Sequence, residues 1–279
     1  MANDLKDKVI ISAALTGAMT PKEANPHIPM TPQEIAEDAY QCWQAGAAVV
    51  HLHMRDENGH GTMNKELFKE TIDLLKQKKD CDVVINCTTS GDSRAGNDER
   101  MAHLEYVMPE MASYDAGSFN WMPGGVFENS PQFLEALGLK MKALGIKPEI
   151  EVFDSGFMNI AGYYVKKEVL TAPCHYQFVL GVLGGMDASV KNLQFLTEML
   201  PAGSTWSAFG IGRHHLPIMY ATLALGGHIR VGLEDNVYYS KGELATNVSL
   251  IDRAVRVIKE FGKEPATPDE ARVLLGLGK

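Results

Sequence analysis

The sequence predicts an α/β protein of the (β/α)8 TIM barrel class. Strand-like and helix-like segments alternate along all 279 residues, the strand-like segments number eight, and no G-x-G-x-x-G follows the first of them. Alternation is typical of a parallel sheet covered by helices, and eight strands is the number of a closed barrel rather than of an open, doubly wound sheet. Because such barrels commonly have this length, we expect residues 1–279 to form a single domain.

The expected strands are short apolar runs bounded by turn residues or helix starts. In chain order they are Val9–Leu15, Ala47–His53, Asp82–Thr88, Ala112–Ala116, Pro148–Phe153, His175–Leu180, Thr205–Ala208 and His228–Val231. The first run follows two lysines and faintly resembles a signal peptide. It is short, however, and acidic residues lie before it, so we expect a core strand.

The expected helices begin and end at characteristic residues. Thr31-Pro32-Gln33-Glu34 and Thr267-Pro268-Asp269-Glu270 are capping boxes with Pro at the first helical position, and Gly46, Gly145 and Pro201 each stop a helix. The helices cover Thr31 to about Ala45, then Asn64–Lys79, Glu99–Met108, Pro131–Leu144, Ser155–Lys166, Ser189–Leu200, Leu216–Leu225, Thr246–Phe261 and a terminal segment from Thr267.

Composition excludes several classes of function. The net charge of −9 argues against a nucleic-acid surface, which needs clustered Lys and Arg. No apolar run reaches transmembrane length. The four cysteines form no C-x-x-C motif and are typical of buried thiols in a reducing compartment, so we expect a cytoplasmic protein.

The second expected strand ends in the motif His51-Leu52-His53. Because side chains alternate along a strand, both imidazoles point to the same face, where two nitrogens can bind one metal ion. A histidine at a strand end is more often a packed or surface residue than a ligand. The pair therefore needs a third ligand before it predicts a site.

Glu234, after the eighth strand, is the best third ligand. The carboxyl ends of barrel strands meet at one mouth, where barrel active sites lie, and two histidines with one glutamate and an open position form a catalytic zinc pattern. A structural zinc site would use four ligands, usually with Cys. On its own, Glu234-Asp235 is equally typical of a solvated loop or a helix start.

Two charged residues flank Glu234. Arg230 in a barrel mouth suits a carboxylate substrate, and Asp235 beside an arginine and a metal ion would stay ionised and act as a base. The alternative is an Arg–Asp ion pair that only orients the loop. Glu151 on the fifth strand is expected either to support a ligating histidine or to form a buried pair with Arg230.

These residues stand within blocks that resemble one family over nearly the whole chain, the β-keto acid cleavage enzymes. The blocks are Ala14-Leu15-Thr16-Gly17-Ala18, Gly46 to His53, Pro148-Glu149-Ile150-Glu151-Val152, Gln177 to Met186, Gly210-Ile211-Gly212-Arg213 and Gly226 to Asn236. So many matched blocks in one order are highly specific.

The resemblance implies a zinc-dependent barrel, commonly a homotetramer, that condenses a β-keto acid with acetyl-CoA and releases acetoacetate and a new acyl-CoA. By position, zinc falls on His51, His53 and Glu234, and Arg230 and Asp235 match the residues that activate the substrate. Thr88 and Ser113 stand where the family's named member has a Ser and a Thr, so their hydroxyls are expected to bind the substrate.

One position departs from the family's named member, which acts on a keto acid with a 5-amino group. There a Glu that meets the substrate ammonium follows Thr-Gly-Ala, whereas this chain has Met19. A thioether cannot pair with a cation. We therefore expect a substrate whose far end is uncharged or apolar, or whose charge another residue meets.

Two other functions remain open on the sequence. A metal-dependent hydrolase of the amidohydrolase kind also uses a barrel with His-x-His, but after its first strand. It needs Lys or His at the ends of the fifth and sixth strands, and the fifth strand of this chain offers Glu151 instead. A non-catalytic barrel that binds a metal or an acyl-CoA is the other alternative.

Overall fold

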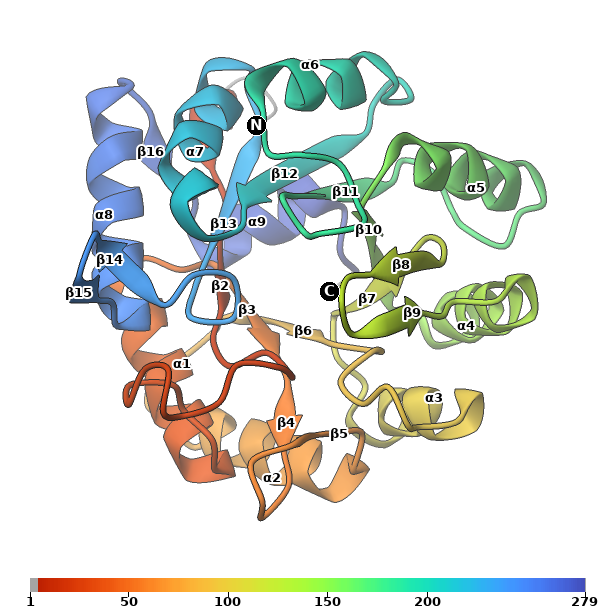
Figure 1. The fold of residues 1–279 in the computed structure, drawn as a ribbon, viewed down its shortest axis with the longest axis horizontal. Helices are drawn as coiled ribbons and strands as arrows, with labels where there is room; N and C mark the ends of the chain where they lie inside the picture. Colours follow the sequence, from red (N-terminus) through yellow and green to blue (C-terminus); the bar gives the residue numbers. More distant parts are fainter. Residues whose placement is uncertain (1–4, 279) are drawn as a thin grey trace.

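Figure 1 shows a computed structural model, which describes residues 5–278 and looks into a closed barrel of eight parallel strands. The strands lie around the barrel in chain order: β2 (Ile11–Ala14), β3 (Val49–Leu52), β6 (Val84–Cys87), β7 (Met111–Asp115), β10 (Lys147–Val152), β11 (His175–Leu180), β12 (Thr205–Gly210) and β13 (His228–Val231). The last strand pairs with the first, which closes the cylinder. The predicted (β/α)8 TIM barrel is confirmed.

All helices but the last lie around the outside of the barrel in Figure 1, and the last lies behind it. The helices are α1 (Pro32–Ala45), α2 (Lys65–Lys76), α3 (Asn97–Val107), α4 (Pro131–Leu144), α5 (Ser155–Lys166), α6 (Val190–Glu198), η1 (Gly212–His214), α7 (His215–Ala224), α8 (Asn247–Glu260) and α9 (Pro268–Leu275). Both predicted capping boxes form, at Thr31 and at Thr267. No helix of the described chain is long and apolar enough to cross a bilayer.

The predicted first strand, Val9–Leu15, is divided in the structure. Residues of β1 (Lys8–Val9) pair with β16 (Glu264–Pro265) outside the barrel, and only β2 enters the cylinder. Three two-stranded hairpins were not predicted: β4 (Met54–Arg55) with β5 (Gly61–Thr62), β8 (Phe119–Trp121) with β9 (Gly125–Phe127), and β14 (Tyr238–Ser240) with β15 (Glu243–Leu244). Each follows a barrel strand, so each borders the mouth.

The apolar core lies between the strands and the helices rather than inside the cylinder. Two large clusters of buried side chains fill that shell, one around β7, β10, β11 and β12 and the other around β2, β3, β6 and β13. A third cluster joins residues at the strand starts, such as Val49 and Met111, to Ala271 and Leu275 of α9. Helix α9 therefore plugs the bottom of the barrel and leaves the opposite end as the mouth.

The interior of the cylinder is polar. Because side chains alternate across a strand, every second residue of β10 and β11 points inward, and the inward positions include Glu149, Glu151, His175 and Gln177. All four are buried. Buried polar groups are stable only when they are hydrogen-bonded or paired with an opposite charge. We therefore expect the inward polar side chains to contact one another in a network of hydrogen bonds and ion pairs.

Candidate active site

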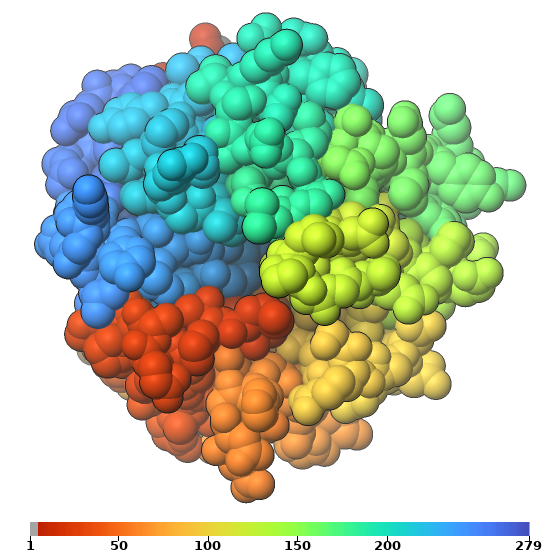
Figure 2. Space-filling model, in the orientation of Figure 1, coloured from red at the N-terminus to blue at the C-terminus, as the bar shows by residue number. Residues whose placement is uncertain are grey.

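The three expected ligands meet at the mouth. His51 is the last residue but one of β3, His53 lies between β3 and β4, and Glu234 lies in the turn after β13. A Cβ atom on Gly17 would lie 2.7 Å from Cγ of Glu234, so the loop after β2 packs directly against this turn. Figure 2 shows the N-terminal loop in red and the β8–β9 hairpin in yellow-green around the centre of this face.

The ligand atoms converge on one point. Nε2 of His53 lies 3.5 Å from Oε1 of Glu234, and Nε2 of His51 lies 3.8 Å from the same oxygen. The two imidazole rings are 5.0 Å apart and inclined at 62°. Sequence alternation placed both rings on one face, and the structure has them there although His53 itself lies just beyond the strand.

The donor set fits a divalent cation of the zinc type. Burial holds the pKa of His51 well below its ordinary value, so the imidazole is neutral and free to bind a metal. Burial opposes ionisation of Glu234, but His53 and Arg230 together hold the pKa of that carboxyl well below its usual range. Oε2 of Glu234 is buried without a hydrogen-bond partner. Two imidazoles and one carboxylate are ligands that zinc prefers.

Arg230 lies beneath the ligands and is paired with three carboxylates. Its Nε and Nη2 each donate to Asp235 at 2.9 Å, Nη2 also donates to Glu234 at 2.5 Å, and Nη1 lies 3.4 Å from Glu151. The guanidinium stacks on Phe209 with 4.5 Å to the ring centre. The bidentate partner of Arg230 in this structure is thus Asp235, and the pair with Glu151 is one of the two arrangements expected from the sequence.

Burial raises the pKa of Asp235 to about 6, and the guanidinium of Arg230 opposes the rise. Burial also raises the pKa of Glu151 well above its ordinary value, although Arg230 lies beside it. A carboxyl with a pKa near neutrality accepts and returns protons efficiently, which is the property of a general base. The arrangement therefore places a base candidate directly next to the metal-ligand candidates.

The two hydroxyls and Met19 occupy different surroundings. Thr88 and Ser113 are buried, and Oγ of Ser113 accepts a hydrogen bond from the backbone N–H of Thr89 at 3.0 Å. Thr88 Oγ1 accepts from the backbone N–H of Ser90 at 3.1 Å. Met19, in contrast, is 73% exposed. The substrate-binding roles of these three residues remain predictions.

Sequence reasoning left Glu149, Asn86 and Asp115 without a role, although all three are buried inside the barrel. Asn86 donates to Oε1 of Glu149 at 2.7 Å. Burial raises the pKa of Glu149, against the opposing effects of Arg230 and of this hydrogen bond. The sequence does indicate an inward position for Glu149, because it stands two residues before Glu151 on the same strand and therefore faces the same way.

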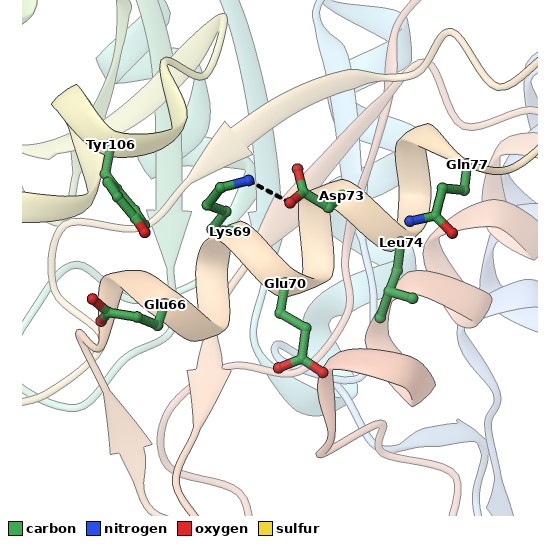
Figure 3. A pocket seen from close by; sticks show the side chains of 7 residues that line it. All are labelled: Glu66, Lys69, Glu70, Asp73, Leu74, Gln77 and Tyr106. Carbon is green, nitrogen blue, oxygen red and sulfur yellow. Dashed lines mark hydrogen bonds and ion pairs between the residues drawn. The ribbon is translucent and has the colours of Figure 1, made fainter.

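A depression on the outer surface lies away from this mouth. It is lined by α2 side chains, among them Lys69 and Asp73, together with Tyr106 of α3 (Figure 3). Lys69 pairs with Asp73 one turn further along the helix, an arrangement typical of a solvated helix face. We therefore place the candidate active site in the mouth.

A family model for beta-keto acid cleavage enzymes matches residues 8–277. The 3-keto-5-aminohexanoate cleavage enzyme of Fusobacterium nucleatum subsp. nucleatum is 43% identical over 99% of this chain and 100% of its own length. The 3-oxoadipate:acetyl-CoA acetyltransferase of Cupriavidus necator is 36% identical over 96% of this chain and 94% of its own. The 3-dehydrocarnitine:acetyl-CoA trimethylamine transferase of Rhizobium meliloti is 35% identical over the full length of both chains.

The solved structure of ObcA without ligands has the same fold, with a TM-score of 0.83 and 23% identity. The match covers 91% of this chain and 66% of the ObcA chain, so this chain spans about two thirds of that protein's length. At this identity the likeness bears on the fold alone. The full-length relatives are named for acetyl-CoA-dependent transfer or for cleavage, which argues against both the hydrolase and the non-catalytic alternative.

Proposed function

Because the chain belongs to the beta-keto acid cleavage enzyme family, we propose that its barrel mouth binds a β-keto acid and acetyl-CoA and converts them to acetoacetate and a new acyl-CoA. The co-substrate is supported by relatives whose names specify acetyl-CoA as a partner. The observation that carries the proposal is the convergence of His51, His53 and Glu234 directly beside the Arg230–Asp235 pair.

We propose zinc as the bound metal, held by those three ligands with a position open for substrate. When bound, it supplies Lewis acidity that draws electron density from the keto oxygen and makes the C2 proton of the substrate acidic. Three carboxyl groups, those of Glu151, Glu234 and Asp235, contact Arg230, and a divalent cation beside them would favour their ionised forms.

The protein residues carry the proton transfer. Asp235 removes a proton from C2, and Arg230, which holds both of its carboxylate oxygens, keeps it aimed at that carbon. The C2 carbanion attacks the thioester carbonyl of acetyl-CoA and releases the CoA thiolate. The thiolate then adds to the original keto carbon, the C2–C3 bond breaks, and C2 regains a proton, giving acetoacetate and the new acyl-CoA.

We further propose that Thr88 and Ser113 hydrogen-bond the substrate carboxylate or the thioester, and that Met19 faces a substrate end that carries no positive charge. Both hydroxyls are buried. By the same family resemblance we propose a cytoplasmic homotetramer. Sedimentation velocity of the purified chain tests the oligomeric state.

The decisive experiment is an assay for acetoacetate formed from acetyl-CoA with a panel of β-keto acids, run on the wild type, on His51→Ala and on His60→Ala. His51→Ala removes a proposed ligand, so we expect it to lose both bound metal and turnover. His60 is an exposed histidine on the β4–β5 turn. His60→Ala therefore shows whether removing a histidine outside the site has the same effect. If His51→Ala retains metal and turnover, the proposal is wrong.

A further inference from the structure

A carboxylate lies behind the proposed metal site, on the side away from the mouth. Glu149 on β10 is 1% exposed and lies in register with Ser113 on β7 and with His175 on β11. Asn86 holds its Oε1 at 2.7 Å, and Oε2 lies 3.9 Å from Nε2 of His175. The position of this carboxylate is therefore set by the hydrogen bond from Asn86, and His175 lies close to its other oxygen.

His51 stands between two carboxylates. Its Nε2 faces Glu234 at 3.8 Å, and its Nδ1 faces Oε1 of Glu149 at 3.9 Å. Nδ1 is buried and has no hydrogen-bond partner. An imidazole that binds a metal through Nε2 carries its proton on Nδ1, and such a proton nearly always goes to a carboxylate, a backbone carbonyl or water.

We propose that Glu149 is a positioning residue for the metal site. When His51 binds a metal, the 3.9 Å gap between its Nδ1 and Oε1 of Glu149 closes to a hydrogen bond, which fixes the tautomer and turns Nε2 toward Glu234 and the metal. This inference rests on the proposed function, since it needs a metal at His51. Glu151 is not the residue that does this, because its Oε1 faces Arg230 at 3.4 Å and neither of its carboxyl oxygens lies within 4.0 Å of a ring nitrogen of His51.

The same atoms also suggest a different arrangement, a second metal ion held by His51, Glu149 and Glu151, whose ligand atoms lie within 4.8 Å of one another. One contact disfavours it. The Arg230 guanidinium lies 3.4 Å from Oε1 of Glu151, and its positive charge would repel a second cation bound there. Metal stoichiometry distinguishes the two arrangements.

The test compares Glu149→Gln and Glu149→Met with the wild type. Glutamine keeps an oxygen for Asn86 but removes the charge, whereas methionine removes the acceptor altogether. We measure the Kd for Zn²⁺ by chelator competition and the visible absorption spectrum of the Co²⁺-loaded protein, which reports ligand geometry. We expect Zn²⁺ binding to weaken by about 10-fold for glutamine and about 100-fold for methionine, with a changed Co²⁺ spectrum.

Glu110→Gln is the matched control. Glu110 pairs with Arg272 at 2.7 Å, far from His51 in the fold, so its loss changes charge without touching the metal site. We expect the wild-type Kd in this variant. If methionine prevents folding, the glutamine variant decides the question, because it retains the bond from Asn86.

Each outcome has a defined meaning. A wild-type Kd and Co²⁺ spectrum in Glu149→Gln would overturn the proposal. Two Zn²⁺ ions per wild-type chain and one per Glu149→Gln chain would overturn it too, since Glu149 would then be a ligand. If the wild type binds no Zn²⁺ at all, the proposed function fails first, and that result is recognised before any variant is compared.

Discussion

Arg55 fixes the backbone that carries Met19. Its guanidinium is buried and donates to the carbonyl oxygens of Gly17 at 2.6 Å, Thr16 at 3.1 Å and Thr20 at 2.9 Å. The loop on either side of position 19 is therefore held, while the side chain of Met19 is 73% exposed. A substitution at this position changes the chemistry at the rim of the mouth without removing a core contact.

We expect Met19→Glu to favour an amino-substituted β-keto acid. A carboxylate there pairs with the substrate ammonium, and an exposed pair stabilises by about 0.2–1 kcal/mol, so KM for that substrate falls by a factor of about 1.4 to 5. KM for an uncharged β-keto acid is the internal reference. Met19→Gln controls for polarity without charge. Equal KM changes for both substrates would show that position 19 does not discriminate between charged and uncharged substrates.

At the scale of elements, helix ends were predictable because their signals are local. The capping boxes at Thr31 and Thr267 and the left-handed glycine at Gly46 lie where the sequence placed them. All predicted barrel strands and outer helices form, with ends that differ by at most three residues. The mouth hairpins were not predictable from apolar periodicity, because strands of two or three residues are too short to show it.

The loop after β2 contacts the turn after β13, so the backbone at Gly17 is expected to affect metal binding by Glu234. Gly17 has φ +62°, and a Cβ there would lie 2.7 Å from Cγ of Glu234. Gly59 has φ +77° with nothing within 4 Å of its Cβ position, so it shares the backbone conformation but not the clash. Alanine at either glycine costs about 1 kcal/mol of folding free energy because of the left-handed backbone.

We therefore expect Gly17→Ala, but not Gly59→Ala, to weaken Zn²⁺ binding, since only the first displaces Glu234. Chelator competition measures the Kd, and urea unfolding of the metal-free proteins measures the shared stability cost. Equal Kd values for the two variants would mean that Glu234 does not need its observed position to bind the metal.

A second contact between elements makes stability depend on pH. Asp38 of α1 accepts a hydrogen bond from Asn247 of α8, whose side chain also donates to the carbonyl of Leu15. Burial raises the pKa of Asp38 from 3.8 to about 6, although the bond from Asn247 opposes the rise. Between these values the folded protein binds a proton that the unfolded chain releases, so stability falls as pH rises from about 4 to about 6.

Asp38→Asn keeps an oxygen for Asn247 and removes the charge. Relative to the wild type, we expect the free energy of unfolding of the variant to rise by up to about 3 kcal/mol between pH 4 and pH 7. Urea unfolding across that range measures it. Asp252→Asn, an exposed carboxylate on α8, is the control and should track the wild type. Parallel curves for Asp38→Asn and the wild type would show that Asp38 ionises in the fold without cost.

At the scale of the whole molecule, sequence separation limited the prediction of the site. Alternation within each strand identified inward residues such as His51, Glu149 and Glu151. It did not identify which of them lie at the same height along the barrel axis. That depends on the stagger between strands, which the closed barrel sets. The observed register aligns His51 with Asn86 and Glu149 with Ser113, and it brings Glu149 rather than Glu151 to Nδ1 of His51.

The proposed metal would join distant parts of the chain. Two ligands lie at the end of β3 and the third lies after β13, so a bound ion links strands on either side of β2, where the chain closes the barrel. A ligand that binds only the folded state stabilises it by about 2.7 kcal/mol at a free concentration of 100 Kd, and by about 1.4 kcal/mol more for each further tenfold. The unfolded chain cannot bring His51, His53 and Glu234 together.

We therefore expect Tm to rise steadily with the logarithm of free Zn²⁺ in a metal buffer, and EDTA to lower it by several degrees. In His51→Ala the dependence should vanish, because the remaining two ligands hold the ion too weakly. His60→Ala should keep it, since that histidine is exposed and outside the cluster. Differential scanning fluorimetry at fixed protein concentration measures all three proteins. An equal rise of Tm in His51→Ala would show that the stabilising metal binds to surface groups. The barrel mouth would then keep its fold without a bound metal.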